Sequence, residues 1–336
     1  MKVNPKEITK VLSLLSPVLA KNVIVDQADH FVFHKQQIVA FNDQLCIRHP
    51  FSCEDVFSVP SSEIYSVFLN MEEEEAEMEV EESNIIISSY QTKAKISILQ
   101  KGFLIDIVKN LPEIEKWSPI PEELCTALSL CQFSASRDVT QGFLMCVLVD
   151  GELVVSSDNL RISIYKMKEK MISEEQILIP ATAIPKILQF SIKDYSVASG
   201  WIHFKTEENI IISSRLLQEQ YPDVSSFFDI QGETILFPKQ IKNIISSLYV
   251  FSVSSLEINR TISLIFDKEF LVCRAEKEIG WIEKKIPCLS KKEFCILINP
   301  VFLSQIFEKT ISKVILSEDR ILLTSDSFSH LIALST

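Results

Sequence analysis

An internal repeat constrains the fold of this chain more than any other feature of its sequence. Segments that begin at Val59, Ile179 and Ile298 each place a proline ahead of apolar residues at helical spacing, and each continues into strand-like patterns. Their starts lie 120 and 119 residues apart. Self-similarity at a fixed period restricts the architecture before any local detail is known.

A second series of helix starts lies between these segments. Pro5, Pro121 and Pro238 open further helical patterns, 116 and 117 residues apart. The chain therefore contains six half-units in three pairs, each a helix followed by strands. We also interpret Asn84-Ile-Ile-Ile-Ser-Ser, Asn209-Ile-Ile-Ile-Ser-Ser and Arg320-Ile-Leu-Leu-Thr-Ser as equivalent strands. The repeat predicts an α+β protein with three similar domains, over residues 1–118, 119–233 and 234–336.

Composition predicts a folded, soluble protein. The 336 residues are 47% hydrophobic, and no apolar run is long enough for a membrane span. Because the N-terminus has no apolar signal core and the eight cysteines are scattered in strand-like segments, we expect a cytoplasmic protein with buried, reduced thiols. The net charge of −12 argues against a protein that coats nucleic acid nonspecifically. A local basic surface remains compatible with this net charge.

A long run of acidic residues precedes the first of the repeated strands. Glu72 to Glu75 are followed by Glu77, Glu79 and Glu81, which alternate with Met78 and Val80. This alternation predicts a strand with one solvated face. The alternative is a repulsive surface that keeps DNA away from the outside of the molecule.

No catalytic motif emerges from the sequence. It contains no glycine-rich phosphate loop, no His-Glu-x-x-His and no Gly-x-Ser-x-Gly. Zinc-ligating residue types do gather early in the chain, but they lack a paired Cys-x-x-Cys and fall in strands whose alternate side chains diverge. We therefore expect no enzyme activity, no metal and no cofactor. A metal-dependent enzyme built on these residues stays open as an alternative: His30, His34, Cys46, His49 and Cys53.

Three motifs make the sequence resemble the bacterial DNA sliding clamp, the beta subunit of DNA polymerase III, along essentially its whole length. Ser213 to Val224 is similar to the family's Thr-Ser-(Lys/Arg)-Leu-x-x-Gly-x-(Phe/Tyr)-Pro-Asp-Tyr. Val154 to Ile162 is similar to its Val-Ala-Thr-Asp-Gly-His-Arg-Leu, and Phe133 to Val139 to its Phe-Ser-x-x-x-x-Asp-Val. The motifs occur in the family's order inside a threefold repeat.

The resemblance implies both a fold and a function. Clamp domains are made of two helix-plus-strands half-units, and two three-domain crescents close head to tail, with sheets outside and helices lining a ring. The chain is then expected to be a processivity factor that encircles duplex DNA as a homodimer. A peptide-binding groove between domains 2 and 3 would tether DNA polymerase, the clamp loader and other replication proteins. Membranes are not among the expected partners.

Basic residues are the expected DNA-binding positions. The resemblance implies a DNA-facing role for Arg137, in a loop, and for Lys21, after the first helix. Other lysines are candidates by helix position alone, and surface solubility explains each of them equally well. They are Lys6, Lys10, Lys186, Lys239, Lys242 and Lys309.

The resemblance also implies a partner groove and a subunit interface. The interface pairs Ile96 and Ile98 of one copy with Leu248 and Tyr249 of the other. The groove residues could instead close a seam between domains. They are Ser157, Asn159, Leu160, Arg161, Ile162, Pro222, Phe227, Leu331 and Leu334.

The chain departs from the clamp pattern in three places. Asn159 and Leu160 replace the family's glycine and histidine, the loop after Arg137 is shorter, and the chain ends in Leu331-Ile-Ala-Leu-Ser-Thr instead of the usual tail. These changes are typical of a divergent clamp, of cellular or viral origin, with altered partner specificity. The alternative function is a clamp-fold interaction scaffold that does not encircle DNA.

Overall fold

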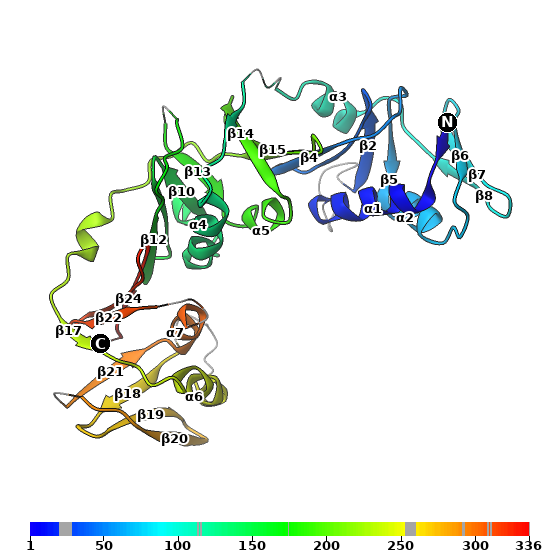
Figure 1. The fold of residues 1–336 in the computed structure, drawn as a ribbon. Helices are drawn as coiled ribbons and strands as arrows, with labels where there is room; N and C mark the ends of the chain where they lie inside the picture. The colour runs from blue at the N-terminus through cyan, green and yellow to red at the C-terminus, as the bar shows by residue number, and fades with distance from the viewer. Residues whose placement is uncertain are drawn as a thin grey trace. The chain divides into compact units, whose positions relative to one another are not determined.

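One half-unit recurs six times in the described part of the chain: a short strand, a helix and three further strands (Figure 1). The computed structural model describes residues 1–19, 29–112, 114, 116–173, 175–252, 260–290, 293–307, 309 and 311–335. The predicted α+β class and the sixfold half-unit pattern are thereby confirmed.

The bounds of the elements follow the repeat closely. The first third contains β1 (Lys2–Val3), α1 (Pro5–Leu15), β2 (His30–His34), β3 (Gln37–Phe41), β4 (Leu45–Pro50), β5 (Phe57–Pro60), α2 (Ser61–Leu69), β6 (Ala76–Val80), β7 (Asn84–Ser88), β8 (Lys93–Ser97) and an additional helix, α3 (Phe103–Lys109). The middle third contains β9 (Ser118–Pro119), α4 (Leu124–Cys131), β10 (Cys146–Asp150), β11 (Leu153–Ser157), β12 (Arg161–Lys166), β13 (Ile177–Pro180), α5 (Ile184–Ile187), β14 (Ile192–Ala198), β15 (Trp201–Thr206) and β16 (Ile211–Arg215). The last third contains β17 (Glu233–Ile235), α6 (Ile241–Leu248), β18 (Ile262–Phe266), β19 (Phe270–Lys277), β20 (Gly280–Pro287), β21 (Phe294–Ile298), α7 (Pro300–Ile306), β22 (Lys313–Leu316), β23 (Arg320–Thr324) and β24 (Phe328–Ala333).

The described residues also contain short 3₁₀ turns, three of which directly follow a helix. They are η1 (Ser16–Val18), η2 (Gln132–Ser134), η3 (Gly142–Met145), η4 (Ser225–Phe228) and η5 (Tyr249–Phe251). The turns η1, η2 and η5 follow α1, α4 and α6, so they occupy equivalent places in the first half-unit of each third.

The described residues form two compact units. The first contains Met1–Ile120 and Thr182–Gln218, and the second contains Pro121–Ala181 and Glu219–Thr336. Each compact unit combines strands from neighbouring thirds of the sequence. The two domain boundaries predicted from the repeat, between residues 118 and 119 and between residues 233 and 234, fall within β9 and β17, and they remain a prediction.

Each compact unit contains one eight-stranded and one four-stranded antiparallel sheet. In the first, the strand orders are β5-β2-β3-β4-β16-β15-β14-β9 and β1-β6-β7-β8. In the second, they are β13-β10-β11-β12-β24-β23-β22-β17 and β20-β19-β18-β21. The final strands of two half-units meet at the centre of each large sheet, where β4 pairs with β16 and β12 pairs with β24.

Local sequence explains several of these elements directly. The Asn4 side chain accepts from the N–H groups of Lys6 and Glu7 and thereby caps α1, while Pro5 occupies its first turn. Strand β6 alternates as expected, with Met78 buried between the exposed Glu77 and Glu79. The alternating glutamates therefore supply the solvated face of β6, which lies between β1 and β7.

The proposed equivalence of the three apolar repeats is wrong for one of them. Asn84–Ser88 and Arg320–Thr324 are the second long strands of their half-units, whereas the residues after Asn209 form β16, a third strand. An apolar run that ends in serines fits any strand with a buried face, so the pattern alone cannot assign strand order. Helix α5 is also shorter than expected, a single turn over Ile184–Ile187.

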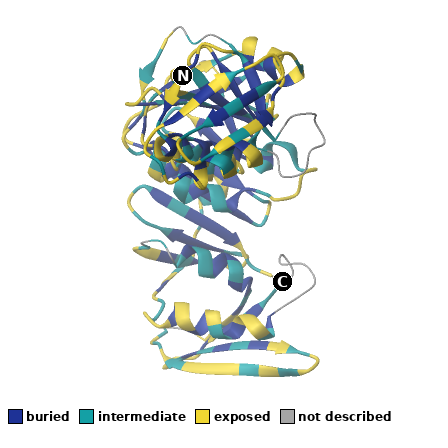
Figure 2. Cartoon of the chain, turned by 90° about the vertical axis from the view of Figure 1, so that its right-hand side faces the viewer, coloured by how far each residue is buried: buried dark blue, intermediate teal, exposed yellow. Residues whose placement is uncertain are grey.

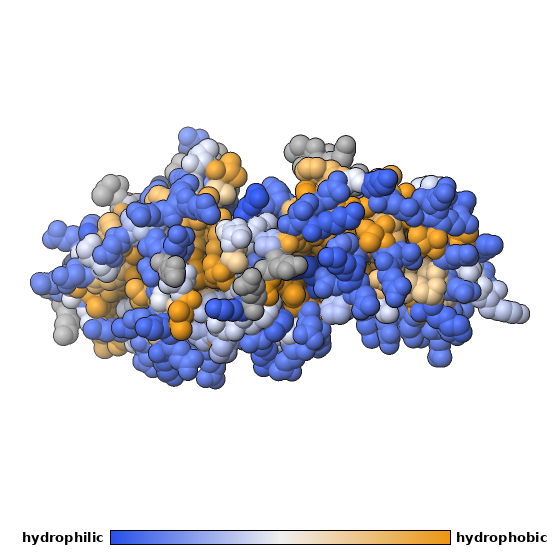
Figure 3. Space-filling model, turned by 90° about the horizontal axis from the view of Figure 1, so that it is seen from above, coloured by the Kyte–Doolittle hydropathy of each residue, from blue (hydrophilic) through white to orange (hydrophobic). Residues whose placement is uncertain are grey.

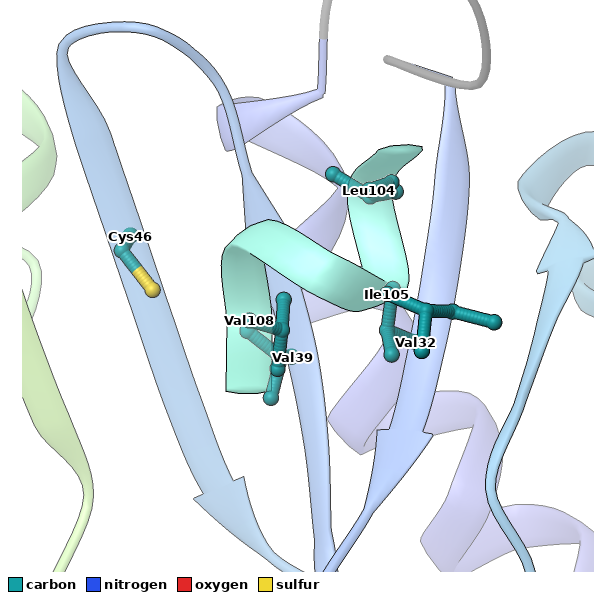
Figure 4. Close-up of a cluster of buried hydrophobic side chains, with 6 residues drawn as sticks. All are labelled: Val32, Val39, Cys46, Leu104, Ile105 and Val108. Carbon is teal, nitrogen blue, oxygen red and sulfur yellow. The ribbon is translucent and has the colours of Figure 1, made fainter. Parts of the chain in front are cut away.

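Helix α3 has no counterpart in the half-unit pattern, and it packs on the first eight-stranded sheet (Figure 4). Leu104, Ile105 and Val108 project from the helix toward strand residues Val32, Val39 and Cys46, and all six are buried. Burial of this apolar face holds the segment after β8 against the sheet.

The exposed surface contrasts with these cores. Hydrophilic side chains cover most of the face seen in Figure 3. In Figure 2 the central strands of the sheets are buried, whereas β20, at the lower end of the view, has no buried residue. Among the described helices, none is long and apolar enough to cross a membrane.

Packing of α3 predicts the effect of truncating Ile105. We expect Ile105→Ala to lower the free energy of unfolding by about 2–5 kcal/mol, because Ile105 is fully buried. Asp106→Ala, at an exposed position of the same helix, is expected to change it by less than about 0.5 kcal/mol. Equal shifts of the denaturant midpoint for the two variants would contradict this account of α3.

Candidate functional site

The turn between β11 and β12 places several predicted site residues together. The Asp158 Oδ1 atom accepts hydrogen bonds from the N–H groups of Leu160 and Arg161, each at 3.1 Å. Asn159 has φ +71°, in the left-handed region, which asparagine tolerates better than most residues. Asparagine can therefore take the place of glycine in this turn.

Arg161 anchors the turn to the rest of the second compact unit. Its Nε donates to Asp158 Oδ2 at 2.9 Å, one terminal nitrogen donates to the Phe133 carbonyl at 2.6 Å, and the other donates to Gln305. The guanidinium also lies 4.2 Å from the centre of the Phe302 ring. Because this buried charge has an ion-pair partner and donates three hydrogen bonds, it is stable in the protein interior.

The residues after this turn line a groove of about 410 Å³ in the second compact unit. Apolar side chains from four segments contribute, including Leu144 from η3, Val224 from the loop before η4, and Leu331 from β24. Asp223, Asp319 and Arg320 add charged groups. A mostly apolar groove with a few polar groups can bind a short peptide or a similar small ligand.

Eight of the nine residues predicted for the partner groove line this one groove, and Ala333 takes the place of Leu334. The eight are Ser157, Asn159, Leu160, Arg161, Ile162, Pro222, Phe227 and Leu331. Sequence reasoning missed Phe143 and Leu144, because they lie in η3, outside the three motifs that carry the resemblance. It also left out Tyr221 and Val224, although both lie in the motif that ends at Val224.

Hydrogen bonds from neighbouring segments fix the loop that carries Tyr221. The Tyr221 N–H donates to Gln176 Oε1 at 2.9 Å, and the Tyr221 ring packs edge-on against Phe143 with centroids 5.3 Å apart. The Phe143 N–H in turn donates to the Glu219 carboxylate at 3.2 Å. These contacts within the chain therefore hold one wall of the groove in place without a bound partner.

Arg320 and Asp319 form a charged pair at the groove. Two nitrogens of Arg320 donate to the two carboxylate oxygens of Asp319, at 2.9 and 2.6 Å. The pairing lowers the pKa of Asp319 and raises the pKa of Arg320. Both side chains stay ionised at neutral pH, so the groove presents a polar edge beside its apolar lining.

A buried polar cluster lies behind the groove. His330 on β24 and Ser163 on β12 share a hydrogen bond of 2.8 Å, and Ser163 bonds Ser134 at 2.7 Å. Burial lowers the pKa of His330 to about 3. In the first compact unit His203 bonds Ser213 at 2.7 Å, and burial lowers its pKa to about 4. Both histidines are therefore neutral at physiological pH.

The predicted DNA-binding residues divide between the compact units. In the first, Lys6 and Lys10 are exposed on α1, while Lys186 on α5 is half-buried and burial lowers its pKa. In the second, Arg137, Lys239 and Lys242 are exposed, and the Lys309 ammonium lies 5.8 Å from the centre of the Phe133 ring. Lys21 lies outside the described residues.

The residues predicted for the subunit interface differ in accessibility. Leu248 is completely buried, and Ile96 and Ile98 face the interior of their sheet. Tyr249 keeps 38% of its surface exposed. A contact made through this region would therefore depend on Tyr249 and its exposed neighbours, with Leu248 supporting them from inside.

The early histidines and cysteines do not form a metal centre in the described part of the chain. No group of three or more His, Cys, Asp or Glu side chains among these residues is arranged to hold an ion. His30 instead bonds the Asp29 carboxylate at 2.8 Å, and Cys46 and Cys53 are buried.

Solved structures with the same architecture identify the fold. The chain matches the DNA polymerase sliding clamp of Bacillus subtilis over 100% of its own length and 98% of that chain, with a TM-score of 0.85 and 16% identity. Clamps from Pseudomonas aeruginosa and Bartonella birtlesii, each bound to griselimycin, match over 100% of this chain and 99% of theirs, with TM-scores of 0.83 and 0.85 and identities of 14% and 16%. The chain has the fold of the DNA polymerase III beta sliding clamp.

The resemblance stated from three short motifs is thus confirmed at the level of the clamp fold. Neither a protein-family model nor a curated protein sequence matches the chain. A divergent sequence therefore retains the clamp fold along its full length, and its groove is built from the segments that carry two of the three motifs.

The buried histidines predict how stability depends on pH. Because their folded-state pKa values lie below the ordinary value of about 6.5, the unfolded chain binds more protons, and stability falls as pH drops below about 6.5. Each histidine is expected to contribute a loss of about 1 kcal/mol per pH unit until its folded pKa is approached. Denaturant unfolding between pH 7.5 and pH 5 measures this slope. His330→Gln should make it shallower, and an unchanged slope would refute the assignment to His330.

Proposed function

We propose that this protein is a sliding clamp, a processivity factor that encircles duplex DNA and tethers a DNA polymerase during replication. The full-length match to the clamp fold carries the proposal. A clamp needs no catalytic centre, because it acts by enclosing DNA and holding its partners nearby. This role agrees with a sequence that has no recognisable catalytic motif.

The strand pattern supports closure of a ring. Each eight-stranded sheet contains the three long strands of a half-unit from one third and those of a half-unit from the next third. Each four-stranded sheet contains the three long strands of only one half-unit. Contacts of this head-to-tail kind generate a ring when the rotation between subunits closes. We propose that two copies of the chain form that ring and that a clamp loader opens it.

A low density of basic charge on the helices suits a sliding contact. Lys6, Lys10 and Lys242 project from helices whose other exposed residues include Ser13 and Ser246. Many phosphate contacts would make binding tight and strongly salt-dependent. Retention by enclosure requires only weak contacts, which leave the ring free to move.

The groove beside β12 and β24 is the proposed docking site for polymerase and loader peptides. Its apolar lining can take the apolar side chains of a peptide, and its charged edge can orient the peptide backbone. An alternative function is a clamp-fold scaffold that uses the groove without encircling DNA. Topological retention on DNA separates the two functions.

Retention on circular DNA tests enclosure. We expect protein that a clamp loader and ATP place on nicked circular DNA to stay bound through gel filtration at high salt, since enclosure does not depend on electrostatic contacts. Cutting the circle should release it. Equal retention on linear and circular DNA would instead favour an ordinary binding protein or scaffold.

Griselimycin offers a defined probe of the groove, since two clamps of this fold were solved with it bound. We expect this chain to bind griselimycin and Phe227→Ala to weaken binding at least about tenfold, because Phe227 is an exposed apolar residue of the groove. Leu289→Ala, at an exposed apolar residue away from the groove, should leave the affinity unchanged. Calorimetric titration measures both. Equal affinities of the two variants would rule out this groove as the site.

A further inference from the structure

One position of the repeat differs between the three thirds in what covers it. Val56, Gln176 and Cys295 each lie directly before the segment that leads toward the helix of a second half-unit. These segments read Phe-Ser-Val-Pro, Ile-Leu-Ile-Pro and Ile-Leu-Ile-Asn, respectively. The three residues are therefore equivalent, and their surroundings can be compared directly.

In the first two thirds, the chain itself covers this position with the segment that follows the last strand of the third. Val56 packs against the apolar cluster that α3 forms on the sheet, and α3 follows β8. The Gln176 side chain accepts from the Tyr221 N–H at 2.9 Å and donates to the Tyr221 carbonyl at 3.5 Å, and Tyr221 follows β16. The position therefore accepts a passing polypeptide segment in both thirds.

In the last third, the described residues leave the same position open. Cys295 is exposed on β21, which lies at the end of its four-stranded sheet. The segment after β24 reaches this strand at Leu297, whose carbonyl accepts from the Ser335 N–H at 2.9 Å. Alternate residues of a strand direct their backbone groups to the same side, so the N–H and C=O of Cys295 face this edge too. No described residue bonds them.

A groove of about 800 Å³ lies along this open stretch of β21. Cys295 and Ile296 line one side, and Gly232 and Leu316, beside and within the paired strands β17 and β22, contribute to the other. We call it the edge groove. An extended peptide can bond to an open strand edge through its main chain while its side chains enter such a groove.

Charge defines the class of peptide that the edge groove fits. No lysine or arginine lines it among the described residues, whereas four carboxylates do: Glu233, Glu293, Glu318 and Asp319. The ion pairs of Glu293 with Lys268 and of Asp319 with Arg320 are solvent-exposed, and exposed pairs are weak. A basic segment is therefore favoured over an acidic one.

An apolar helix like α3 does not fit the last third. Val32 and Val39, on which α3 packs, pair with each other in the first third. The pairing of β5 with β2 and of β21 with β18 makes Ser263 the equivalent of Val32, and Ser263 pairs with Arg274. Because this surface is polar, an extended, charged segment suits it better than an apolar helix.

The edge groove is continuous with the apolar groove beside β12 and β24, since Asp319 lines both. A peptide held in the apolar groove can therefore continue past Asp319 along β21. We infer that the edge groove binds a basic, extended segment of the same partner polypeptide whose apolar residues occupy the apolar groove. This docking site rests on the proposed function, because it extends the proposed site for polymerase and loader peptides.

Two synthetic peptides test the charge preference on the full-length protein. Each has a leucine–phenylalanine pair at its centre, flanked on both sides by serines that alternate with lysines in one peptide and with glutamates in the other. The lysine peptide should bind at least about tenfold more tightly in fluorescence anisotropy titrations. Phe227→Ala should weaken the binding of the lysine peptide, because Phe227 lines the apolar groove.

Charge reversal separates the edge groove from the overall negative charge of the protein. Glu293→Lys combined with Glu318→Lys should remove most of the advantage of the lysine peptide. The matched control combines Glu169→Lys with Glu278→Lys, which changes the net charge equally at exposed residues outside both grooves. This control should keep the advantage.

Thiol trapping at Cys295 provides a measurement of position that does not depend on affinity. A lysine peptide with a cysteine in each flank, activated as the mixed disulfide with thionitrobenzoate, should form a disulfide with the Cys295 thiolate and release thionitrobenzoate. Mass spectrometry identifies the modified cysteine. Phe227→Ala should slow the modification of Cys295, because the peptide is then held less tightly in the neighbouring groove.

The outcomes separate the edge groove from the clamp function. Selectivity for the lysine peptide that only the Glu293 and Glu318 reversal removes, together with trapping at Cys295, supports the edge groove. Protein that stays on circular DNA but binds both peptides equally, or binds neither, overturns the edge groove while the clamp function stands. Selectivity that both double variants retain also overturns it, because the overall charge then accounts for the preference.

Two further outcomes concern the occupant and the function. If the Glu293 and Glu318 reversal abolishes self-association in sedimentation, the groove is a contact between copies of the chain, and the partner segment is overturned. Protein that is released from circular DNA but keeps the local selectivity overturns the clamp function and supports the edge groove as a docking site of a scaffold.

Discussion

Backbone hydrogen bonding along strand edges is the constraint on which this structure depends. Every half-unit ends in a strand whose outer edge must pair, be covered or face water. In the completed sheets β4 pairs with β16 and β12 with β24, and each of these pairs joins neighbouring thirds of the sequence. Among the described strands, β8 and β20 lie at the ends of the two four-stranded sheets. They are the last strands of their half-units, as β4, β16, β12 and β24 are in the pairs above.

The candidate groove follows from one of those pairs. It lies at the seam of β12 and β24, where the Asp158 to Arg161 turn, the end of β24 and the loop around Tyr221 meet. Arg161 links this seam to Phe133 and Gln305 through hydrogen bonds. In the first compact unit, Phe41 on β3 and Trp201 on β15 pack beside the corresponding pair of strands, and Arg215 lies over the Trp201 ring.

Much of this could be predicted from the sequence, because prolines and apolar spacing recur wherever the half-unit recurs. The start of α1 and the alternation of β6 followed from such local patterns. Eight of the nine groove residues came instead from the resemblance to the clamp family, carried by short motifs. Strand order did not, because Asn209-Ile-Ile-Ile-Ser-Ser fits a second or a third strand equally well. The groove contributions of Phe143 and Tyr221, and the burial of Leu248, depend on contacts between distant segments, and no single segment encodes them.

Direct imaging of the protein in solution tests the central claim that this chain closes a ring around DNA. Electron microscopy of the purified protein, combined with its mass by light scattering, reports closure and copy number together. The account predicts closed rings with the mass of two chains, about twice 38.3 kDa. Open particles with the mass of a single chain would contradict it.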